Sequence, residues 1–240
     1  DPETGLGNLA VTDTGNNRVE IFDPDGNFIF QFGSFGADAG KFNSPYGVAV
    51  DFNSQLYVSE KDNDRVQLFD IRGNYLGPVA TGEVNGLVLN DPAGMDVDYL
   101  GNLYIADSAN DRVLKYDVSG NFISAVGGFG WGDGFFDHPL DVAADRNGYF
   151  YVADTGNSRV QKFDQDGRPV LTFGRQGTGE GELLKPASIS VDKYLVYVAD
   201  TGNNRIQIFT KEGKFVLAYA NFNAPTGVCL GTKGSLYVVD

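Results

Sequence analysis

The sequence predicts an all-β fold, a β-propeller of four-stranded antiparallel blades, and three observations lead to this prediction. An acidic residue is followed five positions later by arginine in five copies, whose acidic residues lie 47, 47, 47 and 46 positions apart. Each copy contains short segments rich in aromatic and β-branched residues, which are typical of strands. Turns containing Asn, Asp and Gly separate these segments, as hairpins require. A small sheet cannot bury both of its faces alone, so such units stack, and a closed stack is a propeller.

The fullest copy, residues 139–185, shows the order of elements that we expect in each blade. Its third segment, Arg159–Phe163, alternates outward and inward residues, as a half-buried strand does. A Gly-rich polar loop then leads to the next copy. The four expected strands cover residues 139–145, 149–154, 159–163 and 169–174.

The repeat divides the whole chain, so we expect one domain over residues 1–240. Prolines 47 positions apart open successive copies at Pro45, Pro92, Pro139 and Pro186. The expected repeats are approximately 5–44, 45–91, 92–138, 139–185 and 186–224, with a partial repeat at 225–240. Each third strand ends in an aromatic residue that we expect to pack between blades: Phe22, Phe69, Tyr116, Phe163 and Phe209.

The number of blades follows from counting each type of strand. The second-strand pattern occurs six times, whereas the first strand and the two outer strands occur five times each. We therefore expect a six-bladed propeller with incomplete ends. The alternative is a five-bladed ring in which residues 225–240 complete the N-terminal blade and one strand is left over.

The charge of the chain limits its partners. With 18 basic and 32 acidic residues the formal net charge is −14, which disfavours nucleic acid because phosphate binding needs clustered Lys and Arg. The apolar runs are of strand length, so we expect no membrane insertion. A protein or peptide partner that is basic or neutral fits this surface best. The one cysteine, Cys229, excludes an internal disulfide and is expected to be a small buried hydrophobe.

Three segments carry a resemblance to a known family. Pro-Tyr-Gly-Val-Ala-Val-Asp at 45–51, Tyr-Val-Ala-Asp-Thr-Gly-Asn-Ser-Arg-Val-Gln at 151–161, and Gly36-x3-Gly40-x-Phe42 closely resemble NHL repeats. The resemblance covers essentially the whole chain. It implies a β-propeller, commonly six-bladed, that serves as a protein- or RNA-binding platform; a related branch is an amidating lyase with metal in its channel. That activity does not transfer, because His138 is the only histidine and zinc sites of this kind need several.

The repeated acid–arginine pair is interpreted as a structural staple. Arginine has five donors in a fixed fork, suited to joining a carboxylate and loop carbonyls. A catalytic site is normally singular, whereas this pair recurs in every copy. The staple residues are Asp13, Arg18, Glu60, Arg65, Asp107, Arg112, Asp154, Arg159, Asp200 and Arg205.

Two carboxylates break the repeat on the strand expected to line the channel. Asp96 and Asp141 lie in adjacent copies, at positions where the other copies carry Gly, Ala, Ser or Cys. Together they offer oxygen ligands to a hard cation such as Ca²⁺. Backbone hydrogen bonds or channel water would satisfy them equally well. We therefore expect no cofactor, with Ca²⁺ at Asp96 and Asp141 as the alternative.

One loop stands out by composition, residues 127–138. Phe136 occupies the aromatic position of the repeat and is expected in the core, whereas the aromatic residues Phe129 and Trp131 are additional to the repeat pattern. Exposed aromatic residues on a Gly-rich loop are suited to anchor a peptide, glycan or protein. We take Phe129, Trp131 and Asp133 as the candidate ligand-binding residues. The alternative is that Trp131 covers the end of a blade.

These observations predict a non-catalytic binding or scaffolding module. One alternative is a hydrolase or lyase dependent on Ca²⁺ in the channel around Asp96 and Asp141. Another is a subunit of an extracellular assembly that pairs with a partner or with copies of itself through an open sheet edge. We expect an extracytoplasmic location, secreted or periplasmic, from the acidic, cysteine-poor composition rich in Asn, Gly and Asp and from how often such repeats are secreted.

Overall fold

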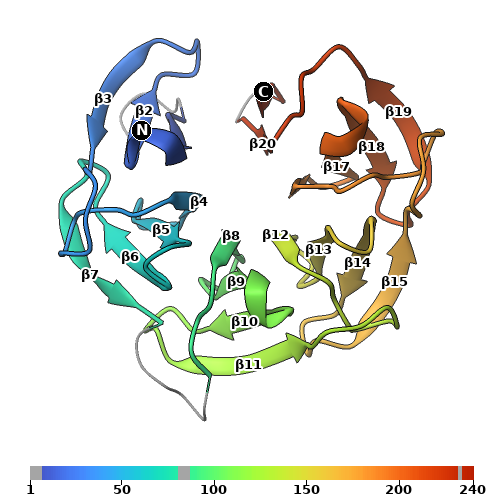
Figure 1. Cartoon of the computed structure of the whole chain (residues 1–240), viewed down its shortest axis with the longest axis horizontal. Coiled ribbons are helices and arrows are strands. Elements are labelled where there is room, and N and C mark those ends of the chain that lie inside the picture. Colours follow the sequence, from blue (N-terminus) through green and yellow to red (C-terminus); the bar gives the residue numbers. More distant parts are fainter. Residues whose placement is uncertain (1–6, 81–86, 232–233) are drawn as a thin grey trace.

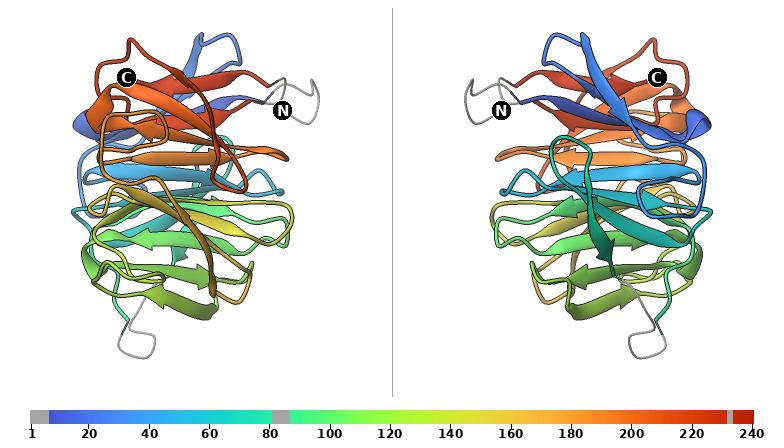
Figure 2. Two further views of the ribbon diagram at one scale, coloured as in Figure 1. Left: turned by 90° about the vertical axis from the view of Figure 1, so that its right-hand side faces the viewer. Right: turned by 90° about the vertical axis from the view of Figure 1, so that its left-hand side faces the viewer.

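A computed structural model describes residues 7–80, 87–231 and 234–240 and shows a ring of small antiparallel sheets around a central opening (Figure 1). In each blade the strands follow one another outward in chain order, so that the first strand faces the opening and the last forms the rim. From the side the sheets lie one above another, with connecting loops at both ends of the strands (Figure 2). The first repeat was expected to begin at residue 5, which lies outside the described residues.

Four blades have four strands, and their bounds agree closely with the expected strands. They are β4 (Pro45–Val50), β5 (Leu56–Glu60), β6 (Arg65–Phe69) and β7 (Tyr75–Val79); β8 (Pro92–Val97), β9 (Leu103–Asp107), β10 (Arg112–Tyr116) and β11 (Phe122–Gly127); β12 (Pro139–Ala144), β13 (Phe150–Asp154), β14 (Arg159–Phe163) and β15 (Pro169–Phe173); β16 (Ser188–Val191), β17 (Leu195–Asp200), β18 (Arg205–Thr210) and β19 (Phe215–Tyr219).

The two ends of the chain form smaller sheets. The N-terminal blade has β1 (Leu9–Asp13), β2 (Arg18–Phe22) and β3 (Phe28–Phe32), and the last sheet has β20 (Gly227–Leu230) and β21 (Leu236–Val239). Short 3₁₀ helices occupy three hairpins: η1 (Thr14–Asn16) between β1 and β2, η2 (Ser108–Asn110) between β9 and β10, and η3 (Thr201–Asn203) between β17 and β18.

The ring therefore holds five blades of three or four strands, the number given by the five-bladed alternative. It differs from the six-bladed expectation because the remaining place is filled by a two-stranded sheet rather than a blade. It also differs from the detail of the alternative, in which residues 225–240 complete the N-terminal blade. Strands β20 and β21 pair with each other and form a sheet of their own.

Aromatic side chains fill the spaces between blades, as the third-strand pattern predicts. Phe69 is fully buried, and its ring centroid lies 5.1 Å from that of Phe32 in the preceding blade and 5.3 Å from that of Phe42. Phe209 packs in the same way against Phe173 of its preceding blade. Full burial of such a side chain contributes about 1.5–3 kcal/mol, so each interface has its own small hydrophobic core.

The first and last sheets also meet. The hydroxyl of Tyr237 on β21 donates to the carbonyl of Pro24, in the turn between β2 and β3, at 2.8 Å. This contact spans 213 positions of the sequence and helps to close the ring. In the described part of the chain, no helix has the length and apolar character needed to cross a membrane.

Candidate functional site

The staple pair lies at the hairpin between the second and third strand of the four-stranded blades and between β1 and β2 of the N-terminal blade. Asp154 ends β13 and Arg159 begins β14, and antiparallel register places them directly opposite each other. The Nε of Arg159 donates to Oδ2 of Asp154 at 2.7 Å, and the Asp154 side chain is fully buried. Burial raises the pKa of Asp154, while the backbone N–H of Asp137 and the side chains of Asn157 and Arg159 counteract this shift. The other four pairs make the same contact.

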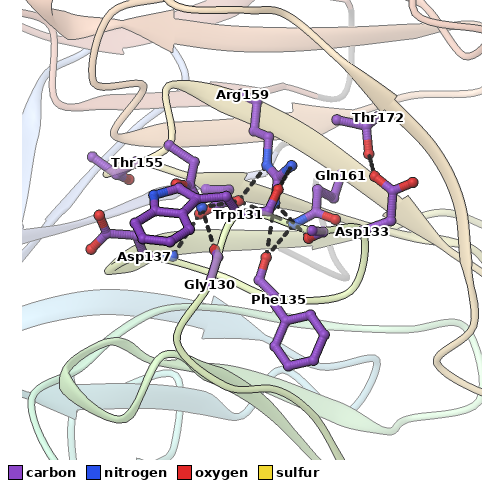
Figure 3. A network of polar contacts seen from close by, with 12 residues as sticks. Gly130, Trp131, Asp133, Phe135, Asp137, Thr155, Arg159, Gln161 and Thr172 are labelled. Carbon is purple, nitrogen blue, oxygen red and sulfur yellow. Dashed lines mark hydrogen bonds and ion pairs between the residues drawn. The ribbon is translucent and has the colours of Figure 1, made fainter.

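The remaining nitrogens of Arg159 bind the loop that enters its blade (Figure 3). Its Nη1 donates to the carbonyl of Trp131 at 2.7 Å, and its Nη2 donates to the carbonyls of Gly132 at 2.9 Å and Phe135 at 3.0 Å. The equivalent arginines bind the preceding loop likewise: Arg65 at Ala37, Asp38 and Lys41, Arg112 at Val88, and Arg205 at Thr178, Gly179 and Glu182.

An asparagine and a glutamine complete this unit, and sequence reasoning did not assign them. Asn157 donates to the carbonyl of Gly130 at 2.9 Å, and Gln161 donates to that of Phe135 at 2.7 Å. Both also donate to Asp154, and Gln161 accepts from the backbone N–H of Gly134. Their fixed positions after the acidic residue were the available signal, with counterparts at Asn16, Asn63, Asn110, Asn203, Gln67 and Gln207.

A second repeated contact holds the far end of each entering loop. Asp111 has a left-handed backbone with φ of 52°, and its Oδ1 accepts the backbone N–H of His138 at 2.7 Å. His138, which precedes the opening proline of the next blade, also has positive φ. The same contact joins four further pairs: Asn17 to Ser44, Asp64 to Asp91, Ser158 to Lys185 and Asn204 to Ala224.

These contacts fix the backbone of residues 127–138, here called the aromatic loop, while three of its aromatic side chains face solvent. Phe129 is 62% exposed, Trp131 is 73% exposed and Phe135 is 50% exposed. The rings of Phe129 and Trp131 meet edge to face with centroids 5.6 Å apart. Phe136 is fully buried, as expected, and packs against Phe163 with the two rings tilted at 56°.

The candidate binding residues are thus only partly brought together. Phe129 and Trp131 touch, whereas Asp133 turns away from them and accepts the hydroxyl of Thr172 on β15 at 2.8 Å (Figure 3). Phe135 is the exposed aromatic residue that the sequence analysis missed, because it sits directly beside the buried Phe136. Its signal was the Phe-Phe pair at 135–136, where the first repeat has Lys41 before Phe42.

The centre of the ring is a channel with a volume of about 730 Å³. Its wall consists of residues from β1, β4, β8, β12, β16, β20 and β21, and it includes Asp96 and Asp141. Cys229 also lines the channel and its side chain is exposed there, which corrects the expectation of a buried cysteine. The reason is that β20 is an innermost strand, so alternate side chains of it face the channel.

Asp96 and Asp141 each connect their strand to the next blade. The carboxylate of Asp96 accepts the backbone N–H of Ala144 on β12 at 2.8 Å, and Asp141 accepts the hydroxyl of Ser188 at 2.8 Å and the N–H of Ile189 at 2.9 Å. Each also accepts the N–H of its own following residue. Burial raises the pKa of Asp96 to about 6 and that of Asp141 to about 7, against the effect of these hydrogen bonds.

One group of three potential metal ligands occurs in the described ranges, and it lies away from the channel residues. Asp111 and the last two residues of the aromatic loop, Asp137 and His138, bring their ligand atoms within 4.8 Å of one another. His138 Nδ1 is 2.7 Å from Asp137 Oδ1, and this hydrogen bond raises the pKa of the imidazole. Neither Asp96 nor Asp141 belongs to this group.

Sequence comparison finds the same repeat that the motifs suggest. The family model described as the NHL repeat matches residues 136–163 and 183–209. The RING finger protein nhl-1 of Caenorhabditis elegans is 49% identical over 43 residues. That alignment covers 18% of this chain and 4% of the nematode protein. It therefore shows similarity of one repeat and not of the two whole proteins.

Solved structures share the fold over nearly the whole chain. A gluconolactonase of Xanthomonas campestris has a TM-score of 0.75 and 18% identity, with 97% of this chain and 78% of that chain covered. A chain of the nidogen/laminin complex has a TM-score of 0.73 and 18% identity, with 97% and 85% covered. The virginiamycin B lyase of Staphylococcus aureus with quinupristin has a TM-score of 0.67 and 12% identity, with 98% and 81% covered. At these identities the likeness shows the fold alone.

Proposed function

We propose that this chain, an NHL-repeat β-propeller, is a non-catalytic binding module whose aromatic loop holds a protein partner. The observation that carries the proposal is the contrast within that loop. Its backbone is fixed by Arg159, Asn157 and Gln161, while Phe129 and Trp131 lie more than half exposed.

This contrast is what a binding hot spot requires. Aromatic side chains supply the largest contributions at protein interfaces. A loop that is already ordered loses less conformational entropy on binding than a free one. The three hydrogen bonds from Arg159 to loop carbonyls therefore favour a preformed contact surface.

The partner we propose is a basic or neutral protein or peptide. The chain carries a formal net charge of −14; Asp137 belongs to the aromatic loop, and Asp111 contacts the end of this loop at His138. Faces of Trp and Phe also attract Arg and Lys side chains. The nidogen/laminin structure is an instance of a similar propeller found in a protein complex, and it supports the class of partner only.

The test compares two variants that remove exposed aromatic residues from equivalent loops. Phe129→Ala with Trp131→Ala removes the edge-to-face pair. Phe35→Ala is the matched control, because Phe35 is 71% exposed at the same place in the loop before β4 and Ala37 stands there in the place of Trp131.

Partners are identified by crosslinking and mass spectrometry with the unmodified protein in an extract of its source, then purified, and their Kd is measured by calorimetry. We expect the double variant to weaken binding about thirtyfold or more, which is the loss of a hot spot of about 2 kcal/mol. Phe35→Ala should stay within about twofold of the unmodified protein, a difference of about 0.4 kcal/mol. Equal Kd values for the double variant and the unmodified protein would exclude the aromatic loop as the contact.

The channel favours a second candidate, an activity or ligand site dependent on a cation. Its volume of about 730 Å³ lies in the range of small-molecule sites, and Asp96 and Asp141 supply two carboxylates. Saturating Ca²⁺ would raise the Tm through preferential binding to the folded state, and Asp96→Asn with Asp141→Asn would abolish that increase. A Tm that is the same with Ca²⁺ and with a chelator would exclude calcium binding in the channel.

A further inference from the structure

The side chains of Asp111, Asp137 and His138 meet where two neighbouring blades join. Asp111 lies in the hairpin between β9 and β10, whereas Asp137 and His138 end the aromatic loop that leads to β12. Two carboxylates and an imidazole are thereby brought together from separate segments of the chain. Carboxylate oxygen and imidazole nitrogen are ligands that Zn²⁺ takes in proteins.

The distances within the group suit one small cation. His138 Nδ1 lies 2.7 Å from Asp137 Oδ1 and 3.8 Å from Asp111 Oδ1, and the three ligand atoms lie within 4.8 Å of one another. Zn²⁺ binds such atoms at about 2.0–2.2 Å, which places two ligands of a tetrahedral ion about 3.3 Å apart. Small side-chain rotations therefore bring the three atoms onto one ion. The His138 side chain is 65% exposed, so a further coordination position stays open to water.

Backbone contacts hold the three residues in place without using up their ligand atoms. The N–H of Asp137 donates to Asp154 Oδ1 at 2.9 Å, and the N–H of His138 donates to Asp111 Oδ1 at 2.7 Å. A carboxylate offers about four acceptor positions, so Asp111 retains lone pairs for a cation. The carboxylate of Asp137 points away from Arg159 (Figure 3), and the staple does not use it.

This set of ligands occurs in one of the five copies of the repeat. The residues equivalent to Asp137 are Asn43, Asn90, Leu184 and Asn223, and those equivalent to His138 are Ser44, Asp91, Lys185 and Ala224. In the preceding copy a protein cation is already present, because Lys61 Nζ lies 3.7 Å from Asp91 Oδ1. The group around His138 thus departs from the repeat towards metal ligands.

A buried hydroxyl without a partner lies in the same hairpin. Ser108 begins η2 and is 1% exposed, and in the part of the chain that the structure describes its Oγ has no hydrogen-bond partner. Threonines at its position in three other copies donate to the carbonyl of the next opening proline: Thr14 to Pro45, Thr155 to Pro186 and Thr201 to Pro225. This equivalence places Ser108 beside Pro139, the residue after His138. A water bound to a cation at His138 would give such a hydroxyl its partner.

We propose that Asp111, Asp137 and His138 bind one Zn²⁺ ion, with water in the remaining coordination position. The mixture of carboxylate and imidazole favours a transition-metal ion over Ca²⁺, which prefers oxygen ligands alone. The ion joins the hairpin of one blade to the loop that enters the next. The site requires neither the channel carboxylates nor a protein partner.

The test is calorimetry with Zn²⁺ on the folded protein after a chelator has been added and dialysed away. We expect one equivalent to bind. Asp137→Asn and His138→Ser should each raise the Kd at least about tenfold, because each removes a ligand. The first copy carries Asn43 and Ser44 at these places, so the repeat accepts both substitutions. Asp64→Asn is the matched control, since it removes a carboxylate from the equivalent contact of the preceding blade; its Kd should stay within about twofold.

His138 gives a second readout that needs no substitution, because it is the only histidine in the chain. Nitrogen NMR of its imidazole should show a shift of the Nδ1 signal when Zn²⁺ is added. An unshifted imidazole at saturating Zn²⁺ would overturn the proposal even if the variants did not fold. A Kd for His138→Ser equal to that of the unmodified protein would also overturn it, because the ion would then be bound elsewhere.

Discussion

At the scale of single residues, the arginines of the repeated motif make different contacts because their neighbours differ. Arg159 binds a fully buried carboxylate and three carbonyls of the aromatic loop. In the part of the chain that the structure describes, Arg18 contacts Asp13 and Glu20, and its side chain is 31% exposed. The energetic role of a repeated residue therefore depends on the burial of its partner, which is complete for Asp154, whereas the Asp13 side chain is 23% exposed.

We expect Arg159→Ala to lower the free energy of unfolding by about 3 kcal/mol, because it leaves the buried carboxylate of Asp154 without its cation. Arg18→Ala is the matched control and should cost less than about 1 kcal/mol, as an exposed pair does. Urea denaturation of both variants gives the two values. Equal costs would show that the loop contacts of Arg159 add nothing to stability.

The second residue-scale prediction concerns the pH dependence of Asp141. Its pKa is raised from 3.8 to about 7, so the folded protein binds the proton more tightly than the unfolded chain does. Asp141 therefore stabilises the fold fully below about pH 4, and this contribution is lost as the pH rises towards about 7. Asp141→Asn cannot titrate.

The difference in unfolding free energy, unmodified protein minus Asp141→Asn, should consequently fall between pH 4 and pH 7, by at most about 1.4 kcal/mol per pH unit. Asp96, whose pKa is raised to about 6, is present in both proteins, and its charge is one of the causes that raise the pKa of Asp141, so the difference reports Asp141 together with its coupling to Asp96. Chemical denaturation across this range measures it. A difference that is constant or rises with pH would contradict the assignment.

At the scale of elements, the innermost strands are joined by carboxylates that use the space left by glycine. A Cβ at Gly94 on β8 would lie 2.0 Å from Oδ1 of Asp141 and 2.8 Å from its Cα. Asp141 in turn binds Ser188 and Ile189 on the next blade. Three consecutive blades are thus connected through one close approach.

Gly94→Ala should lower stability by about 2–3 kcal/mol, because the added methyl group displaces the carboxylate that joins these blades. Gly77→Ala on β7 is the control, since a Cβ there meets nothing within 4 Å. It should leave the free energy of unfolding unchanged or raise it by less than about 1 kcal/mol. Similar losses of unfolding free energy in the two variants would show that the contact between the added methyl group and Asp141 costs no stability.

At the scale of the whole molecule, closure of the ring depends on contacts between the two smallest sheets. The Tyr237 hydroxyl reaches the Pro24 carbonyl, so the last sheet is tied to the first blade. The sheet of β20 and β21 has two strands of its own and little area to stabilise it alone.

Tyr237→Phe should lower stability by about 0.5–1.5 kcal/mol and speed amide hydrogen exchange in both β20–β21 and the turn at Pro24. Tyr197→Phe is the control at the same position of the preceding blade, where the hydroxyl binds Asp192 within its own sheet. Its effect on exchange should stay in that sheet. Faster exchange at the amides of Asp25 and Gly26, in the turn that contains Pro24, in Tyr197→Phe as well would show that the ring opens as one unit.

What the sequence determined by itself is the repeating unit. Strand periodicity and turn residues are local properties, so strands such as Arg159–Phe163 and the opposition of Asp154 to Arg159 follow from their spacing alone. The tertiary structure decided everything that depends on residues from different copies meeting. It separated Asp133 from Trp131, exposed Phe135 and turned Cys229 towards the channel. It also placed Lys211 within hydrogen-bonding distance of Asp145 on the preceding blade. These outcomes depend on how one blade packs against the next. Side chains from different copies come within reach of a common partner only when the ring has formed, so their contacts cannot be read from the repeat alone.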